Sequence, residues 1–365
     1  MGLGAEMIAD PILKIIILIF LIVGLFILAS ASIGVTASMK LPSYYFILKQ
    51  ILNGGIAGLL LFFIGYKVPY KKWKSWSLII FVSGLLLTAA VFSPIGFSAG
   101  GATRWISFGS ITFQPSEFLK LSLIVYLAAW FSSGKRNISS VKEGLMPFLV
   151  IMGLPAMLLI SQPDIGTLGV VAISGLLLFL IAGGKFTHVL FMIVAGLVIL
   201  AVLVFLEPYR FDRVQVFLNP DHDPQGAGYQ VKQALIAIGS GGIFGRGFGM
   251  SRQKFEYLPE PVGDSIFAVA AEEFGFMGSA VLVLLLLAFS WRGFYVSRFS
   301  QDVFGKLFGS GIVILVVIQS LINIAALSGL APLTGIPLIF VSQGGSALAL
   351  TLLEMGILLN ISRAR

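Results

Sequence analysis

The stretch ILKIIILIFLIVGLFILASASI (12–33) contains a single charged residue, Lys14. As an α-helix it would be about 33 Å long, enough to cross the ~30 Å hydrocarbon core of a bilayer. The rest of the 365-residue chain has a similar character: 58% of its residues are hydrophobic, 11% are charged, and the mean hydropathy is +1.00. Soluble domains carry roughly 25% charged residues, so the composition indicates a membrane protein.

Further apolar windows of similar length follow along the chain. A membrane-spanning barrel would instead show alternating segments of about ten residues, so we expect helices, which satisfy their own backbone hydrogen bonds. The predicted fold class is all-α, a polytopic membrane protein that forms a single transmembrane domain over residues 1–365. The ten expected helices are 12–33, 46–66, 77–94, 115–132, 145–161, 165–183, 187–206, 263–291, 306–328 and 341–361.

Lys and Arg are distributed unevenly between the connecting segments. If the N-terminus is cytoplasmic, fourteen basic residues fall on the cytoplasmic side, whereas the short outer loops hold only Lys40, Lys49 and Arg104. Because cytoplasmic loops carry the excess of positive charge, both termini are expected to be cytoplasmic. The polar segment 207–263, between the seventh and eighth helices, is then a large extracytoplasmic loop.

The composition excludes several kinds of site. The chain has no cysteine, which excludes disulfides, thiolate metal sites and cysteine nucleophiles. Its two histidines, His188 and His222, are too far apart in sequence to suggest a histidine metal site. The net charge of +8 reflects topology and attraction to anionic lipid, so no nucleic-acid partner is expected.

Charged residues inside the apolar windows are costly, at least about 2.5–3.5 kcal/mol each on insertion scales. Glu117 and Lys120 are three residues apart, so they lie on one helix face within pairing reach. They form either a structural ion pair or part of a polar cavity that the substrate reaches. Glu354 lies deep in the last window, and the sequence does not identify its partner.

Two aspartates stand at the start of apolar windows. Asp164, in SQPDIGT (161–167), is expected to cap the following helix, with direct substrate contact as the alternative. Asp264, in YLPEPVGDSIFAVAAEEFGF (257–276), ends a charged segment of the chain. It is a candidate general base, and an N-cap role, worth roughly 1 kcal/mol, is the alternative.

Glycines are dense in GSGGIFGRGFG (239–249), but neither a GxGxxG nor a Walker A spacing occurs. The segment is expected to be a closely packed loop with positive φ at several glycines. Arg246, Arg252 and Lys254 beside it either bind a pyrophosphate or are solvated surface charges.

Segments in order along nearly the whole chain resemble the SEDS family of FtsW, RodA and SpoVE proteins. Among these, PYRFDRV, SRQKFEYLPE and the short first extracytoplasmic loop are more similar to FtsW than to RodA. The matching segments are RWISFGSITFQPSEFLKL (104–121), SQPDIGT (161–167), PYRFDRV (208–214), DPQGAGYQ (223–230), IGSGGIFGRGFGMSRQKFEYLPEPVGDSIFAVAAEEFGF (238–276), TGIPLIFVSQGGSALAL (334–350) and MGILLNIS (355–362).

This resemblance implies a peptidoglycan glycosyltransferase that polymerises lipid II, an undecaprenyl-linked disaccharide-peptide, at the outer face of the bacterial cytoplasmic membrane. It also implies a class B penicillin-binding protein as partner, within the divisome for an FtsW-like member or the elongasome for a RodA-like one. The family's essential acid falls on Asp264, although Val262 and Gly263 replace its common His-Thr neighbours. The family's paired Glu and Lys in the fourth span fall on Glu117 and Lys120. Further candidates in the matching segments are Arg104, Asp164, Gln343 and Ser346.

Lipid II polymerisation needs a base near the attacking 4-hydroxyl and cations near the pyrophosphate that leaves. Asp264 is the expected base, because partial desolvation at the membrane edge raises a carboxyl pKa toward the useful range. A divalent ion, Mg²⁺ or Mn²⁺, is a further possible source of positive charge. The candidate cations are Arg210, Arg213, Arg246, Arg252 and Lys254.

Two other function classes fit parts of the sequence. A lipid II flippase or another transporter would also use intramembrane charges, but its site would lie near the bilayer midplane at broken helices. Here the densest polar group is in the 207–264 segment, and no repeated halves are visible. The third class is a scaffold that only recruits and activates a synthase.

Overall fold

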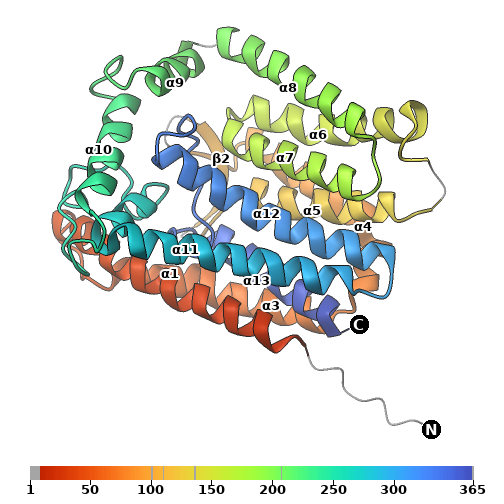
Figure 1. The fold of residues 1–365 in the computed structure, drawn as a ribbon, viewed down its shortest axis with the longest axis horizontal. Helices are drawn as coiled ribbons and strands as arrows, with labels where there is room; N and C mark the ends of the chain where they lie inside the picture. The colour runs from red at the N-terminus through yellow and green to blue at the C-terminus, as the bar shows by residue number, and fades with distance from the viewer. Residues whose placement is uncertain (1–8, 100–101, 110, 135–136, 207, 364–365) are drawn as a thin grey trace.

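The computed structural model describes the chain except for residues 1–8, 100–101, 110, 135–136, 207 and 364–365. Helices dominate the described residues, which confirms the all-α prediction (Figure 1). The helices are α1 (Pro11–Ser38), α2 (Tyr45–Gln50), α3 (Ala57–Lys67), α4 (Tyr70–Ala89), α5 (Pro115–Phe131), α6 (Met146–Ser161), α7 (Ile165–Ile181), α8 (Phe186–Leu206), α9 (Pro208–Leu218), α10 (Ala227–Ser240), α11 (Ile266–Arg298), α12 (Val303–Leu327) and α13 (Gly345–Arg363).

Short turns extend several of these helices. The π-helical turns η1 (Ile51–Ile56) and η3 (Val141–Leu145) precede α3 and α6, and the 3₁₀ turn η2 (Ala90–Phe92) follows α4. With these turns included, eight helices among the described residues are long and apolar enough to cross a membrane. The two remaining predicted spans, 115–132 and 165–183, coincide with α5 and α7, which have 17 residues each.

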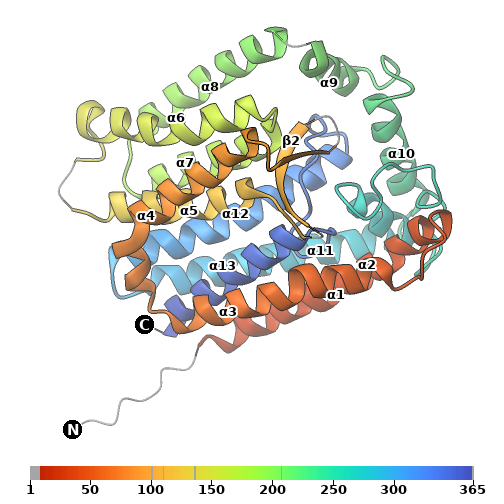
Figure 2. The ribbon, with the colours of Figure 1, turned by 180° about the vertical axis from the view of Figure 1, so that it is seen from behind.

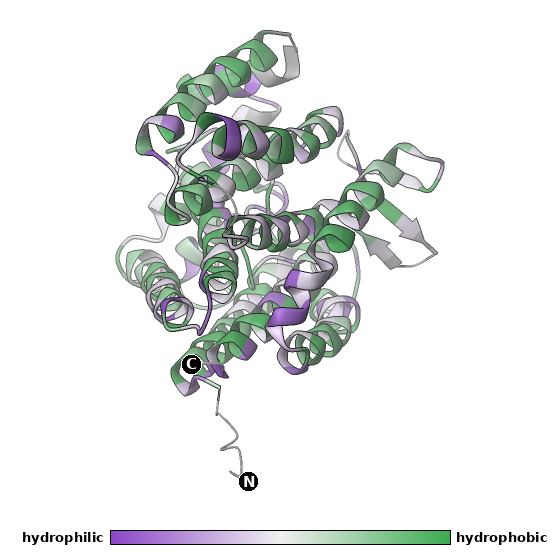
Figure 3. Cartoon of the chain, turned by 90° about the vertical axis from the view of Figure 1, so that its right-hand side faces the viewer, coloured by the Kyte–Doolittle hydropathy of each residue, from purple (hydrophilic) through white to green (hydrophobic). Residues whose placement is uncertain are grey.

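The long helices lie roughly side by side, and the start of α1 and the end of α13 lie at one end of the bundle (Figures 1 and 2). We call this the terminal end and the opposite end, which carries α9 and α10, the loop end. Seen along the bundle in Figure 3, most helices are green and apolar, with hydrophilic purple confined to short segments. At the terminal end Asp10 is buried and forms an ion pair with Arg292, 2.6 Å away.

Helix α13 occupies the centre of the bundle. Every residue from Leu348 to Ser362 is buried, although α13 meets the length and composition of a membrane span. It contacts α1, α3, α5, α11 and α12. Its neighbours rather than lipid therefore surround it.

The structure adds two elements that the hydropathy windows did not predict. A small antiparallel sheet, β1 (Gly96–Ala99), β2 (Ala102–Phe108) and β3 (Ile111–Phe113), lies between α4 and α5 in the order β1-β2-β3. The polar segment 207–263 contains the helices α9 and α10 instead of being a loop throughout. Both are too short or too polar to be found as membrane spans.

Helices α3 and α13 approach closely through glycines on both sides. A Cβ atom on Gly65 would lie 2.6 Å from the Leu353 carbonyl oxygen and 2.9 Å from the Ile357 nitrogen. On α13, a Cβ on Gly356 would meet the backbone of Phe62. Small residues at such contacts let helix backbones pack directly, which is a main source of association between helices in membranes.

We predict that Gly65→Ala lowers the free energy of unfolding by about 1–3 kcal/mol, because the added methyl group forces α3 and α13 apart. The measurement is the thermal unfolding midpoint of the purified protein in detergent. Gly169→Ala is the matched control, because a Cβ there has no atom within 4 Å. An equal effect of both substitutions would contradict the close-packing explanation.

Candidate functional site

The backbone around Asp264 is held in place from two directions. Asn323, near the end of α12, donates from Nδ2 to the carbonyl oxygens of Asp264 and Ile336, at 2.8 Å each. Ser342 Oγ donates to the Gly263 carbonyl at 2.7 Å. These bonds tie the start of α11 to α12 and to the segment between α12 and α13.

The Asp264 carboxylate is less strongly engaged than its backbone. Its nearest described donor is Gln230 Nε2 on α10, 3.5 Å from both carboxylate oxygens, and this amide lies closer to Ser265 Oγ, at 3.0 Å. Ser265 is the residue at the N-cap of α11, and no side chain caps that helix. The alternative expectation, that Asp264 is the N-cap, is therefore wrong.

The surroundings of Asp264 favour its protonated form more than water does. Burial is the main cause, and with the nearby negative charge of Glu260 it raises the pKa of the Asp264 carboxyl to about 6. The Gln230 amide and the Arg213 guanidinium act in the opposite direction. A partly buried carboxyl group with such a pKa is suited to accept a proton near neutral pH.

A cavity of 210 Å³ at the loop end is lined by two arginines from distant parts of the chain. Arg213 extends from α9 and donates from Nη1 to the Leu333 carbonyl at 2.8 Å. Arg104, on β2, donates to the Pro163 carbonyl. Leu200 and Val204 of α8 add an apolar wall, so the cavity joins positive charge to a hydrocarbon-like surface.

Arg213 also connects this cavity to the acid. Its charge acts on the Asp264 carboxyl, and the segment Ala331–Thr334 that lines the cavity leads directly into Gly335 and Ile336 beside Asp264. A Cβ placed on Gly335 would lie 3.8 Å from Asp264 Oδ2. The structure thus places Arg213 between Asp264 and the cavity that Arg104 also lines.

Three other predicted cations lie in a different cluster. Lys254 is buried, with Nζ 2.7 Å from Glu273 Oε1 and 3.1 Å from Ser30 Oγ of α1. Arg246 Nε is 3.5 Å from Glu272 Oε1, and the backbone nitrogen of Arg252 donates to the same oxygen at 3.1 Å.

Glu272 is six residues beyond Ile266, the first residue of α11, a rise of about 9 Å at 1.5 Å per residue, and Asp264 precedes Ile266 by two residues. The expectation that Lys254 binds pyrophosphate does not agree with this placement, because its ammonium group is enclosed by protein. The side chain of Arg210 lies outside the described residues.

Glu117 and Lys120 form a buried pair inside the bundle, with Nζ 2.9 Å from each carboxylate oxygen. Lys120 also donates to Gln319 Oε1 of α12. Glu354 lines the same cavity, which at 10 Å³ holds one water at most. The structural ion-pair alternative therefore fits better than a cavity that substrate enters, and the neighbours of Glu354 are now identified.

The remaining predicted residues have structural contacts. Asp164 caps α7 as expected, because its Oδ1 accepts from Thr167 N at 3.2 Å. Ser346 Oγ accepts from Gln114 N at the start of α5, at 3.1 Å. The backbone nitrogen of Gln343 donates to the Val262 carbonyl oxygen at 2.8 Å, two residues before Asp264.

Sequence reasoning did not identify the amides that organise these sites. Gln230, Asn323 and Gln319 are single polar residues whose partners lie far away in sequence. Asn323 and Gln319 had one available signal: amides in an otherwise apolar helix need a partner, since unpaired polar groups are costly in a bilayer.

Comparison with known proteins covers nearly the whole chain. The family model described as FTSW_RODA_SPOVE, cell cycle protein, matches residues 11–365. The chain belongs to the FtsW/RodA/SpoVE family. This confirms the resemblance to SEDS proteins, and the family members are multi-pass membrane proteins like the one described here.

Relatives and solved structures of this family are similar over their full length. Stage V sporulation protein E of Bacillus subtilis is 41% identical over 97% of both chains. A probable peptidoglycan glycosyltransferase FtsW of Trichlorobacter lovleyi is 34% identical, over 97% of this chain and 93% of its own. A chain from a peptidoglycan synthase complex that coordinates polymerization and crosslinking superposes with a TM-score of 0.80 at 28% identity, covering 100% of this chain and 99% of its own. RodA of Thermus thermophilus superposes with a TM-score of 0.73 at 26% identity, covering 98% of this chain and 97% of its own.

For this SEDS protein we predict that Lys120→Met lowers the free energy of unfolding by about 3–5 kcal/mol, because it leaves the Glu117 carboxylate buried without its partner. Thermal unfolding in detergent measures the loss. The double variant Glu117→Gln/Lys120→Met removes both charges and should recover a large part of it. Equal losses in the single and double variants would show that the pair is not coupled.

Proposed function

We propose that this chain is an FtsW-like peptidoglycan glycosyltransferase that polymerises lipid II, with Asp264 as the general base. The observation that carries this proposal is a weakly engaged carboxylate with a pKa raised to about 6, beside a cavity that combines two arginines with an apolar wall. Family membership and the names of the FtsW relatives support the reaction type.

In the proposed reaction, the 4-hydroxyl of one sugar attacks the anomeric carbon of another. Asp264 accepts the hydroxyl proton, the new glycosidic bond forms, and the bond from the anomeric carbon to the pyrophosphate oxygen breaks. The bonding electron pair leaves with undecaprenyl pyrophosphate. Inversion from an α-linked donor to a β-linked product needs a single carboxylate base, so no second one is required nearby.

The cavity lined by Arg104 and Arg213 is the proposed site of the pyrophosphate. Guanidinium groups bind phosphate oxygens through charge-assisted hydrogen bonds, and Leu200 and Val204 offer a surface for the start of the polyprenyl chain. The described residues contain no cluster of three or more potential metal ligands. A divalent ion bound to the pyrophosphate would add positive charge there, and no step of the proposed reaction depends on one.

The proposed cellular setting follows from the relatives. FtsW relatives at 34–37% identity favour a division role with divisome partners over RodA-like elongation. The similarity to a chain of a peptidoglycan synthase complex supports a class B penicillin-binding protein as partner. The proposed location is the bacterial cytoplasmic membrane, with the loop end and Asp264 on the outer side.

We predict that Asp264→Ala lowers the rate of glycan formation by at least about 10²-fold, as expected for loss of a general base. Purified protein, alone and with a candidate penicillin-binding protein, is given labelled lipid II, and glycan chains are measured. Asp221→Ala is the control, because Asp221 is an exposed acid of the same segment, paired with Lys232.

Three outcomes of this assay would argue against the proposal. Equal polymerisation by Asp264→Ala and wild type would exclude Asp264 as the base. Movement of lipid II across vesicle membranes without polymer would favour a transporter. Polymer that forms only with the partner, at the same rate for both variants, would favour a scaffold.

A second prediction concerns the pH dependence of the rate. The base acts in its deprotonated form, so kcat/KM should rise with pH and level off above the pKa of about 6. Because the charge of Glu260 raises that pKa, Glu260→Gln should move the rise to lower pH. Glu256→Gln, which removes an exposed charge four residues earlier, should leave the profile unchanged; a shift toward higher pH in Glu260→Gln would contradict the assignment.

A further inference from the structure

The segment 241–255, between α10 and α11, exposes several large apolar side chains and buries one of its three cations, Lys254. Phe244 is 82% exposed and Met250 64%, and Ile243 and Phe248 are exposed as well. Lys254, by contrast, is 1% exposed. A loop in water rarely exposes so many large apolar side chains within eight residues, and such a patch points to a non-aqueous neighbour.

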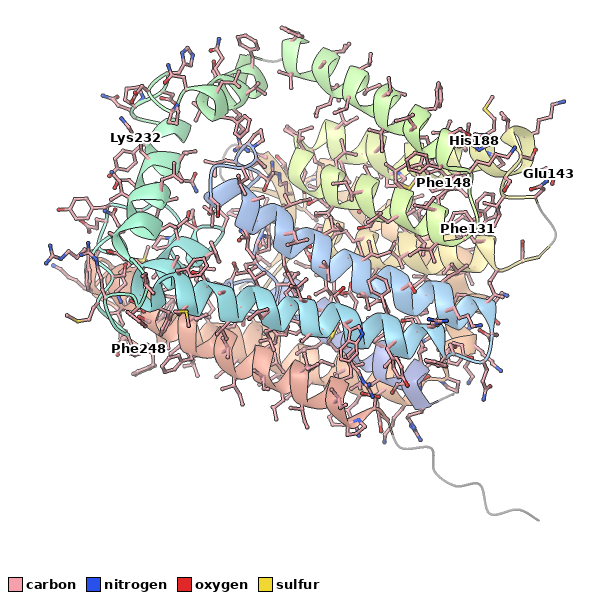
Figure 4. The ribbon with its side chains drawn as sticks, viewed as in Figure 1. Phe131, Glu143, Phe148, His188, Lys232 and Phe248 are labelled. Atoms are coloured by element: carbon pink, nitrogen blue, oxygen red, sulfur yellow. The ribbon has the colours of Figure 1, made fainter. Side chains whose placement is uncertain are left out.

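The segment runs along α1 rather than away from the bundle. Phe248 stacks on Phe26 with ring centroids 4.3 Å apart, and the Gly249 nitrogen donates to Ser30 Oγ at 3.1 Å. The Lys254 carbonyl lies against Gly34 so closely that a Cβ there would clash. Figure 4 shows Phe248 beside α1, and Figure 1 shows that α1 ends at the loop end.

The length of α1 fixes how deep these contacts lie. Its 28 residues form a helix of about 42 Å, which exceeds the ~30 Å hydrocarbon core by about 12 Å. Phe26 is twelve residues before Ser38, about 18 Å along the helix. Even if all the excess length lay at the loop end, Phe26 would be about 6 Å inside the hydrocarbon boundary.

Phe26 itself is 49% exposed on the outside of α1, at the depth of the hydrocarbon. The Phe248 ring that stacks on it therefore extends a surface that already faces lipid. A mainly apolar groove with a volume of 670 Å³ adjoins the segment at Gly242, and most of its lining comes from α11, including Phe276 and Leu284.

Two carboxylates of α11 bind several polar groups of the segment, which lowers the cost of irregular backbone at this depth. The Glu272 carboxylate accepts from Ser251 Oγ at 2.6 Å and from the nitrogens of Arg252 and Gln253 at 3.1 and 3.2 Å. Glu273 accepts from Lys254 Nζ at 2.7 Å. Arg246 is paired with Glu272 as well, and the exposed side chains of Arg246 and Arg252 are long enough to extend from the segment toward the headgroup region.

We propose that residues 241–255 form a re-entrant loop that enters the leaflet on the Asp264 side, with Ile243, Phe244, Phe248 and Met250 in contact with lipid acyl chains. The loop interacts with the bilayer as a surface, whatever reaction the protein catalyses. It returns to the loop end through Lys254, and its two halves are joined to α1 and to the start of α11.

Site-directed spin labelling tests the depth of the loop directly. Because the chain has no cysteine, Phe244→Cys and Met250→Cys can each carry a single nitroxide on the full-length protein in phosphatidylcholine–phosphatidylglycerol vesicles. Accessibility to apolar O₂ and to the polar complex Ni(II)EDDA is measured by power saturation. The controls are Gln225→Cys, exposed in the segment between α9 and α10, and Leu287→Cys, 54% exposed on α11.

Both loop labels should resemble Leu287→Cys, with high O₂ accessibility and a Ni(II)EDDA accessibility about tenfold below that of Gln225→Cys, because the polar complex partitions poorly into hydrocarbon. Ni(II)EDDA accessibility equal to that of Gln225→Cys would overturn the proposal by placing the loop in water. Low accessibility to both reagents would overturn it as well, by showing that protein covers the loop.

Discussion

Hydrocarbon offers no hydrogen-bond partner, and this single property of the bilayer explains where the charges of this protein lie. Ion pairs occur at three levels of the bundle: Asp10 with Arg292 at the terminal end, Glu117 with Lys120 inside, and Glu273 with Lys254 near the loop end. The first and third pairs join different elements, and in the second Lys120 also donates to Gln319 of α12. Removal of one partner from such a buried pair leaves an uncompensated charge and is strongly destabilising.

Because hydrocarbon offers no partner, the charges that hold the structure together are fully paired within the protein, whereas a charge available for chemistry is not. Lys254 and Lys120 are each bound by a carboxylate and a further oxygen. Among the described side chains, Gln230 alone donates to the Asp264 carboxylate, at 3.5 Å from both oxygens, although the Asp264 backbone is firmly held. A carboxylate that is fixed in position but weakly paired can change its protonation state without disturbing the fold around it.

Much of the fold could be predicted from the sequence, because a membrane span depends on a local property, the run of apolar residues. The ion pair between Glu117 and Lys120 was predictable for a similar reason, since three residues on a helix bring two side chains to one face. The pair between Lys254 and Glu273 was not, because 19 residues, including the non-helical segment before α11, separate its members. The small sheet and the helices α9 and α10 gave no hydropathy signal, and the cavity between Arg104 and Arg213 exists only once β2 and α9 have packed at the same end.

The break in α11 has a consequence for how the chain can vary. Gly275 has a non-helical backbone, with φ 65° and ψ −163°, and the 23 residues from Phe276 to Arg298 extend about 34 Å and cross the hydrocarbon core alone. The preceding residues Ile266 to Glu273 are therefore not needed to span the membrane, yet each of them is buried. Every side of the helix is in contact with protein there, so a substitution at any of these positions changes a packed contact. From Phe276 onward, exposed positions recur at helical spacing, and sequence change can accumulate against lipid without reaching the residues that hold Asp264.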